Sequence, residues 1–176
     1  MNRPWILWIP LAVVAFIGGL AIYGLAVPKD DQGHAAMSGK KLPAFALPAA
    51  TAGVPALSNT DMADGKPRLL NIFASWCLPC KAEAPQLEAL KAAGVEIDAI
   101  AIRDKPEDVA AFLDEFGNPF RRIGSDSEML VQLKLGSSGV PETYVIGGDG
   151  TILFQHIGDI RAEHVPMLIE KVNAAK

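Results

Sequence analysis

The chain has few cysteines, few histidines and no long stretch of positive charge. Its 176 residues include two cysteines and three histidines, and the formal net charge is −4. Two cysteines cannot form the several bridges of a small disulfide-stapled domain. Without a basic patch or a basic tail, nucleic acid is not an expected partner. The sequence also shows no internal repeat, which argues against a repeat architecture.

The two cysteines stand close together in Trp76-Cys77-Leu78-Pro79-Cys80, directly after the mostly apolar run Leu69–Ala74. A bridge between such close residues closes a small loop and stabilises the fold little, so the pair indicates chemistry. The alternative is half of a zinc site, which needs a second cysteine pair or two histidines at ligand spacing. His34, His156 and His164 lack that spacing. We therefore expect no metal and no cofactor besides the cysteine pair.

The N-terminal region has no charged side chain between residues 5 and 27. About 20 apolar residues span a bilayer as a helix, so this run predicts a transmembrane helix. Arg3 precedes the run, and the positive-inside bias then leaves the bulk of the chain outside the cytoplasm. The prediction is a membrane anchor at 1–28, a linker at 29–41 and one domain at 42–176. A cleaved signal peptide is the alternative, because Gly24 and Ala26 fit a small-x-small cleavage site.

The hydrophobic pattern of the domain predicts an α/β fold with a mixed sheet and helices on both sides. Apolar runs predict strands at 68–75, 95–102, 143–146 and 151–155, with a tight hairpin turn at 147–150. Helical periodicity with capping and stop residues predicts helices at 80–93, 106–116, 126–135 and 162–173. An edge strand at 42–47 and a short strand at 54–57 are weaker expectations.

The position of Cys77 at the mouth of a helix favours a reactive thiolate, because helix N-termini carry free amide donors and partial positive charge. We assign Cys77 as the nucleophile and Cys80 as the resolving thiol, which together exchange disulfides with a partner. Leu78 and Pro79 would tune this exchange by apolar contact and by fixing the bend. Trp76 is either a flat platform for the partner or a core residue.

These motifs resemble the thioredoxin superfamily. The resemblance rests on the apolar strand that enters Trp-Cys-x-Pro-Cys, on Pro85 in the following helix, and on Gly139-Val140-Pro141 before a strand. It implies a thioredoxin-like fold in which Pro141 is cis and the backbone of Val140 pairs with a bound partner chain. An ordinary turn proline is the alternative for Pro141.

A closer resemblance is to the membrane-anchored thiol-disulfide proteins of cytochrome c maturation, the DsbE or CcmG type. It covers about residues 40–176 and rests on residues 70–83, 139–144 and 156–160. It implies a single-pass protein of the bacterial inner membrane, monomeric, with its C-terminal domain in the periplasm. There it would reduce the haem-attachment disulfide of apocytochrome c, directly or through a partner thiol protein of the maturation complex. A membrane electron donor would then reduce it again.

Two alternatives remain open. One is a broader exported disulfide reductase that serves other proteins. The other is a non-catalytic module that holds apocytochrome or haem without turnover. Cysteine-to-serine variants separate them, because only a binding module works without its thiols.

Two glutamates complete the candidate site. Thioredoxins place a buried aspartate six residues before the first cysteine, where this chain has Asn71. Glu83, one helical turn after Cys80, is a candidate to handle the Cys80 proton; the alternative is a solvated acid in the first helical turn. Glu142 follows Pro141 and either contacts a basic partner segment or is simply exposed.

Overall fold

The described N-terminal residues, 8–26, form a helix. The computed structural model describes residues 8–26 and 37–175, and the chain divides into two compact units, residues 1–33 and 34–176. The first unit contains α1 (Ile9–Ala26). Among the residues described, no helix has the length and apolarity needed to cross a membrane. The other residues of the predicted anchor, and residues 29–36 of the predicted linker, lie outside the described part.

The second unit is built on a five-stranded mixed sheet with the order β5-β4-β3-β6-β7. Its strands are β3 (Arg68–Phe73), β4 (Ile97–Ile102), β5 (Arg122–Asp126), β6 (Glu142–Ile146) and β7 (Ile152–Ile157). The pairs β3–β4 and β4–β5 are parallel, whereas β3–β6 and β6–β7 are antiparallel. The predicted mixed sheet is therefore confirmed, and its central strand is β3.

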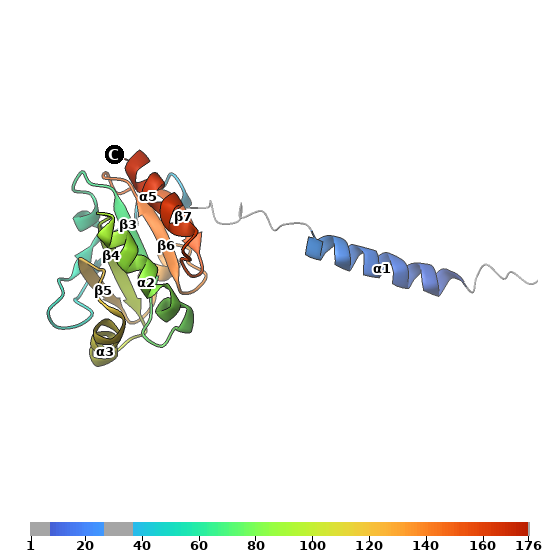
Figure 1. Cartoon of the computed structure of the whole chain (residues 1–176), viewed down its shortest axis with the longest axis horizontal. Helices are drawn as coiled ribbons and strands as arrows, with labels where there is room; N and C mark the ends of the chain where they lie inside the picture. Colours follow the sequence, from blue (N-terminus) through green and yellow to red (C-terminus); the bar gives the residue numbers. More distant parts are fainter. Residues whose placement is uncertain (1–7, 27–36, 176) are drawn as a thin grey trace, which may run out of the picture. The chain divides into compact units, whose positions relative to one another are not determined.

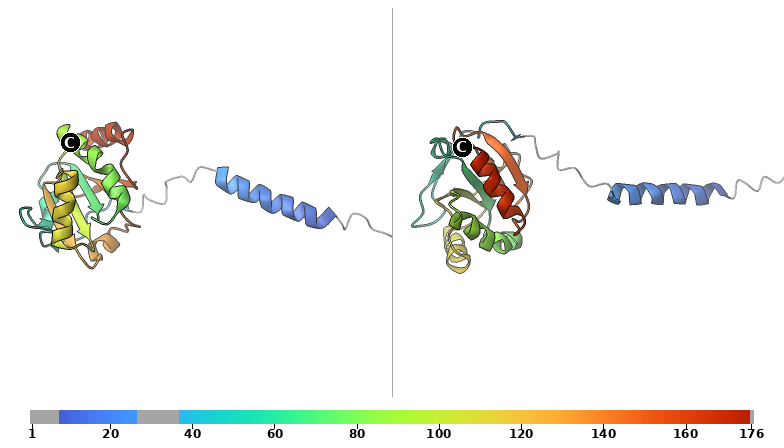
Figure 2. Two further views of the ribbon diagram at one scale, coloured as in Figure 1. Left: turned by 60° about the horizontal axis from the view of Figure 1, so that its bottom comes forward. Right: turned by 45° about the horizontal axis from the view of Figure 1, so that its top comes forward.

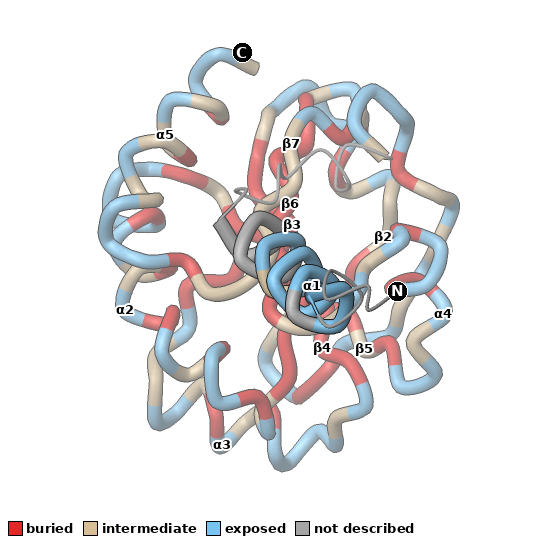
Figure 3. Tube along the Cα trace, turned by 90° about the vertical axis from the view of Figure 1, so that its right-hand side faces the viewer, coloured by how far each residue is buried: buried red, intermediate tan, exposed pale blue. Residues whose placement is uncertain are grey.

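Three helices cover one face of this sheet and smaller elements cover the other (Figure 3). On the first face lie α2 (Leu78–Ala92), α3 (Pro106–Phe116) and α5 (His164–Ala174). Figures 1 and 2 show α2 and α5 next to each other over the central strands. Both parallel crossovers, through α2 and α3, progress in the same direction across the sheet, so right-handed connections place both helices on one face.

The opposite face carries a short helix and a small hairpin (Figure 3). Its elements are β1 (Ala46–Leu47), β2 (Leu57–Ser58), the 3₁₀ helix η3 (Asn59–Met62) and α4 (Leu130–Lys134). The predicted strand at 42–47 is reduced to β1, which pairs with β2 in a separate antiparallel sheet. Because both faces are covered, every residue of β3, β4 and β6 is buried, and β3 and β4 read as nearly continuous apolar runs.

The sequence prediction missed strand β5 and placed a helix too early, at 126–135. Gly124 interrupts the apolar pattern of β5, and it is needed because a Cβ at this position would lie 2.8 Å from Leu47 Cβ. Asp126 ends β5 and its carboxylate accepts the N–H groups of Leu130, Val131 and Gln132. Asp126 thus caps this helix, which begins only at Leu130, after a left-handed residue at Met129 with φ 59°.

Candidate active site

The disulfide lies where the central strand passes into α2. After β3 the chain turns at Ser75 and Trp76, and Cys77 is the N-cap of α2. Cys77 and Cys80 are bonded, with Cα atoms 5.3 Å apart, and Cys77 Sγ accepts the Cys80 N–H at 3.2 Å. The helix therefore directs one N-terminal donor at the Cys77 sulfur, which favours a thiolate there once the bond is reduced.

The two sulfur-bearing residues are covered by the protein, whereas the residues around them are exposed. Cys77 is 4% exposed and Cys80 1%. Leu78, between them, is 77% exposed, and Pro79 is exposed as well. Leu78 and Pro79 are thus exposed between the two cysteines, and their predicted role in tuning the exchange stays a prediction.

Trp76 is not a core residue. It is 58% exposed, and its Nε1–H donates to the Arg103 carbonyl at 3.3 Å. Together with Ser75, Lys81, Phe112 and Phe116, among others, it lines a depression of about 350 Å³ beside α2 and α3. The core-packing alternative for Trp76 is wrong, and an open indole next to the nucleophile remains available as a platform.

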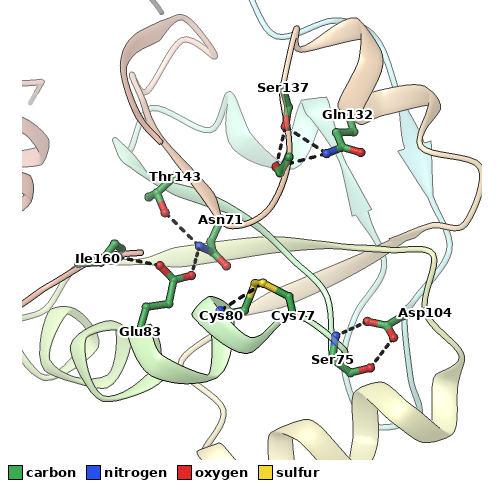
Figure 4. Close-up of a disulfide and its surroundings, with 11 residues drawn as sticks. Asn71, Ser75, Cys77, Cys80, Glu83, Asp104, Gln132, Ser137, Thr143 and Ile160 are labelled. Carbon is green, nitrogen blue, oxygen red and sulfur yellow. Dashed lines mark hydrogen bonds between the residues drawn. A yellow bond between two sulfur atoms is a disulfide. The ribbon is translucent and has the colours of Figure 1, made fainter. Parts of the chain in front are cut away.

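The loop before β6 contains the cis proline that the resemblance predicts. The Val140–Pro141 peptide bond is cis, so the ordinary turn alternative is wrong. Pro141 is buried and its carbonyl accepts the Gly158 N–H at 3.0 Å, while Val140 is half-buried. Behind the loop, the Gly139 carbonyl accepts bonds from Ser137 Oγ at 3.0 Å and Gln132 Nε2 at 3.3 Å (Figure 4).

Glu83 lies one turn after Cys80 on the face of α2 that meets the sheet, and it is fully buried. Its Oε1 accepts from Asn71 Nδ2 at 3.0 Å and its Oε2 from the Ile160 N–H at 2.9 Å (Figure 4). Burial raises the pKa of Glu83 to about 7, although the Ile160 and Asn71 bonds lower it. The alternative of a solvated first-turn acid is therefore wrong.

Asn71 connects this carboxyl group to the neighbouring strand. It stands directly opposite Thr143 in the β3–β6 pair, and Asn71 Nδ2 also donates to Thr143 Oγ1 at 3.0 Å. In the described part of the chain, Asn71 Oδ1 has no hydrogen-bond partner although it is buried. A protonated Glu83 needs an acceptor, and rotation of this amide supplies one.

Glu142 does not reach the surface, so both sequence alternatives for it are wrong. It is fully buried on β6. Its Oε1 accepts from the Ser138 N–H and Ser138 Oγ, both at 2.9 Å. Its Oε2 accepts from Tyr144 OH at 2.8 Å and Gln155 Nε2 at 3.2 Å. The alternation of β6 explains this, since Glu142 and Tyr144 project to the face opposite Thr143.

Sequence reasoning missed a second carboxylate beside the disulfide. Asp104 follows β4, and both of its oxygens accept from Ser75 (Figure 4). A signal was present, because the carboxyl ends of neighbouring parallel strands meet at one edge of a sheet, where β3 leads to Ser75 and β4 to Asp104. Sequence reasoning also missed the Ile160 N–H as a donor to Glu83, because a backbone donor leaves no pattern in the side chains.

A redox-active disulfide at the N-terminus of a helix, after the central strand of such a sheet and with a cis-proline loop before β6, defines a thioredoxin-like thiol-disulfide oxidoreductase. The cysteine pair itself is the redox group. Within residues 8–26 and 37–175 no group of three or more metal-ligating side chains occurs.

The comparisons with known proteins agree with this class. The Redoxin family model matches residues 37–170. The chain is 34% identical over 174 residues to the thiol:disulfide interchange protein HelX of Rhodobacter capsulatus, which covers 99% of this chain and 98% of that protein. It is 33% identical over 159 residues to DsbE of Escherichia coli, covering 88% and 86% of the two.

A solved structure is similar as well. The crystal structure of a putative thiol:disulfide interchange protein DsbE from Chlorobium tepidum matches with a TM-score of 0.65 and 27% identity, covering 78% of this chain and 96% of that one. The chain therefore belongs to the Redoxin family and, within it, to the thiol:disulfide interchange proteins of the DsbE type.

Proposed function

We propose that this oxidoreductase is a reductant of cytochrome c maturation, held at the bacterial inner membrane with its C-terminal domain in the periplasm. Its substrate would be the disulfide of the haem-attachment segment of apocytochrome c, reached directly or through a partner thiol protein. The observation that carries the reducing direction is the buried Glu83, whose pKa is raised to about 7 by burial one turn after Cys80.

A carboxylate behind the cysteine pair favours electron donation. Its charge disfavours the thiolate form, so it destabilises the dithiol state relative to the disulfide. Oxidants of this fold do the opposite, because they stabilise their reduced form. With a pKa of about 7, Glu83 also takes up and releases a proton near neutral pH.

The exchange then proceeds in two balanced steps. The Cys77 thiolate attacks one sulfur of the partner disulfide, so the partner bond breaks, a Cys77–partner bond forms and the released thiolate takes a proton. Cys80 gives its proton to Glu83 and attacks Cys77 Sγ, which breaks the mixed disulfide and frees the second partner sulfur as a thiolate that takes a proton from solvent. Two electrons pass from the dithiol to the partner. A dithiol of the membrane electron donor reverses the change at Cys77 and Cys80.

The N-terminal sequence supports the proposed location. Residues 5–27 carry no charge and Arg3 precedes them, which favours attachment of residues 1–28 to the membrane with the domain outside. In an oxidising compartment, thiols needed for haem attachment require a dedicated reductant. Attachment would also raise the local concentration of the domain near membrane partners. Alkaline extraction of membranes tests this, and release of the full-length chain would contradict the anchor.

Trapping on Cys80→Ser tests the substrate. This variant cannot resolve the mixed disulfide, so we expect it to accumulate with apocytochrome c or with one thiol protein of haem attachment. A Cys77→Ser strain should lose haem attachment, and exogenous dithiol should restore it. Trapping of many unrelated exported proteins would instead indicate the broader reductase. Normal haem attachment in both single variants would indicate the binding module.

A further inference from the structure

A second carboxylate holds the other side of the disulfide loop. Asp104 lies in the loop after β4 and is half-buried. Its Oδ2 accepts the Ser75 N–H at 2.6 Å and its Oδ1 accepts from Ser75 Oγ at 2.5 Å (Figure 4). Ser75 stands two residues before Cys77, after the buried part of β3 has ended. Both bonds are charge-assisted and therefore short and directional.

The neighbouring residue of the same loop holds Trp76. The Arg103 carbonyl accepts the Trp76 Nε1–H at 3.3 Å. Arg103 has a positive φ of 47°, which is unfavourable for a residue with a side chain and persists only where the surroundings fix it. The loop at 103–104 thus contacts both residues that lead into the nucleophile, one through a side chain and one through a backbone carbonyl.

We propose that Asp104 is a positioning residue for thiol-disulfide exchange: its bonds to Ser75 fix the turn that presents the Trp76 indole and Cys77 to a partner. The proposal rests only on the thiol-disulfide chemistry of the chain, so it stands or falls independently of the cytochrome substrate. In the described part of the chain, Asp104 bonds to Ser75 and not to either sulfur, so it acts through the Ser75–Trp76 turn.

The surroundings of this contact argue for a functional more than a stabilising role. Ser75 is half-buried and both Trp76 and Arg103 are exposed, so little apolar surface depends on their arrangement. The adjacent core packs without this contact. Its Phe73 ring centroid lies 5.3 Å from that of Phe112 and 5.1 Å from that of Phe120. Loss of the Asp104 bonds should therefore alter the reaction more than the stability.

The test compares Asp104→Ala, Asp104→Asn and Ser75→Ala in the full chain in detergent micelles. Asp114→Ala, at an exposed acid on α3, is the matched control. The first measurement is the rate at which the reduced protein reduces a disulfide-bonded peptide. Since small misplacements of reacting groups cost large factors in rate, Asp104→Ala should be about tenfold slower. Ser75→Ala keeps the bond from its N–H and should be about threefold slower.

Asp104→Asn separates geometry from charge. Its amide can accept the Ser75 N–H and donate to a rotated Ser75 hydroxyl, so it keeps both contacts without the charge. We expect the rate of this variant to lie within about twofold of the wild-type rate, because both bonds to Ser75 are preserved. A rate as low as that of Asp104→Ala would overturn the positioning role.

A spectroscopic readout follows Trp76 itself. The chain has three tryptophans, so the variants are made with Trp5→Phe and Trp8→Phe, which leaves Trp76 as the only indole. Asp104→Ala should increase quenching of its fluorescence by acrylamide, whereas Asp104→Asn and Asp114→Ala should not. Unchanged exchange rate and unchanged quenching in Asp104→Ala would overturn the proposal. So would a rate loss in Asp104→Ala that only parallels global unfolding at the assay temperature.

Discussion

The two buried glutamates differ in how many donors surround them. Glu83 lies on the face of α2 that meets the sheet and has two donors, Asn71 Nδ2 and the Ile160 N–H. Glu142 lies on the other face of β6 and accepts from four groups on Ser138, Tyr144 and Gln155. Both side chains are fully buried, so exposure does not distinguish them.

The difference shows how one sheet can use the same residue type for two purposes. Four donors replace most of the water that a carboxylate loses on burial, which favours a fixed group that anchors its surroundings. Through Ser138, Glu142 fixes the loop that leads to the cis Pro141. Two donors leave the Glu83 charge undercompensated, and its raised pKa of about 7 keeps the proton exchangeable near neutral pH.

The largest predicted effect is the loss of stability in Glu142→Ala, which removes the glutamate that anchors its surroundings. Removing this acceptor leaves the buried Tyr144 hydroxyl without its acceptor and releases Ser138. We expect the oxidised protein to lose about 4 kcal/mol of unfolding free energy, since several bonds to a charged group are lost together. Denaturant unfolding measures this, with Glu170→Ala at an exposed position of α5 as control. A loss equal to that of the control would show that Glu142 anchors nothing.

Glu83→Gln should produce the next largest effect, and it should depend on pH. The folded pKa of about 7 exceeds the ordinary 4.5, so the group stabilises the fold below pH 4.5 and this stabilisation is lost as the pH rises to 7. Across this pH window, the free energy of unfolding of the wild type should fall by on the order of 3 kcal/mol relative to that of Glu83→Gln. The free energy of unfolding of both proteins, measured from pH 4 to 8, gives this difference. Parallel curves of stability against pH would refute the raised pKa of Glu83.

The same variant also tests the chemistry. Removal of a nearby carboxylate should lower the pKa of the Cys77 thiol in the reduced protein, because a like charge disfavours the thiolate. Iodoacetamide alkylation followed against pH reports this titration. Identical alkylation profiles in wild type and Glu83→Gln would show that Glu83 does not affect the pKa of the Cys77 thiol. Asp114→Asn, on the exposed side of α3, serves as the control for added net charge.

The smallest effect belongs to Tyr144→Phe, which removes one of the four donors to Glu142. The hydroxyl also accepts from Gln155 Nε2 at 3.1 Å, so two contacts are lost. We expect the free energy of unfolding to fall by about 2 kcal/mol, since each net hydrogen bond contributes about 1 kcal/mol. In a double-mutant cycle with Glu142→Ala, the effect of Tyr144→Phe should shrink, because its acceptor is already gone. Strict additivity would show that the two side chains do not cooperate.

Much of this architecture could be predicted from local patterns. The apolar runs of β3 and β4 and the stop at Gly94 mark their elements with little ambiguity. Strand β5 could not be found this way, because its Gly124 reflects a contact with Leu47 that is distant in sequence. The cis state of Pro141 came from the family motif, which encodes tertiary context that a proline alone does not.

The burial of the acidic residues was beyond sequence reasoning for a related reason. Glu142 begins a strand and Glu83 lies near a helix start, and both positions usually favour exposed acids. The donors to these two carboxyl groups come from β3, the loop before β6, β6, β7 and the loop after β7, which only the folded sheet brings together. The catalytic role of Glu83 and the partner contacts of Val140 and Trp76 stay predictions until the variants are measured.

The bond from Ile160 to Glu83 also has a consequence for the newly made chain. Its donor and acceptor are separated by 77 residues. A ribosome that has just added Glu83 has produced a peptide with both thiols and this carboxyl, but without the Ile160 N–H that binds it in the folded protein. The surroundings of Glu83 are therefore complete only when the last hairpin has joined the sheet and Ile160 lies in place.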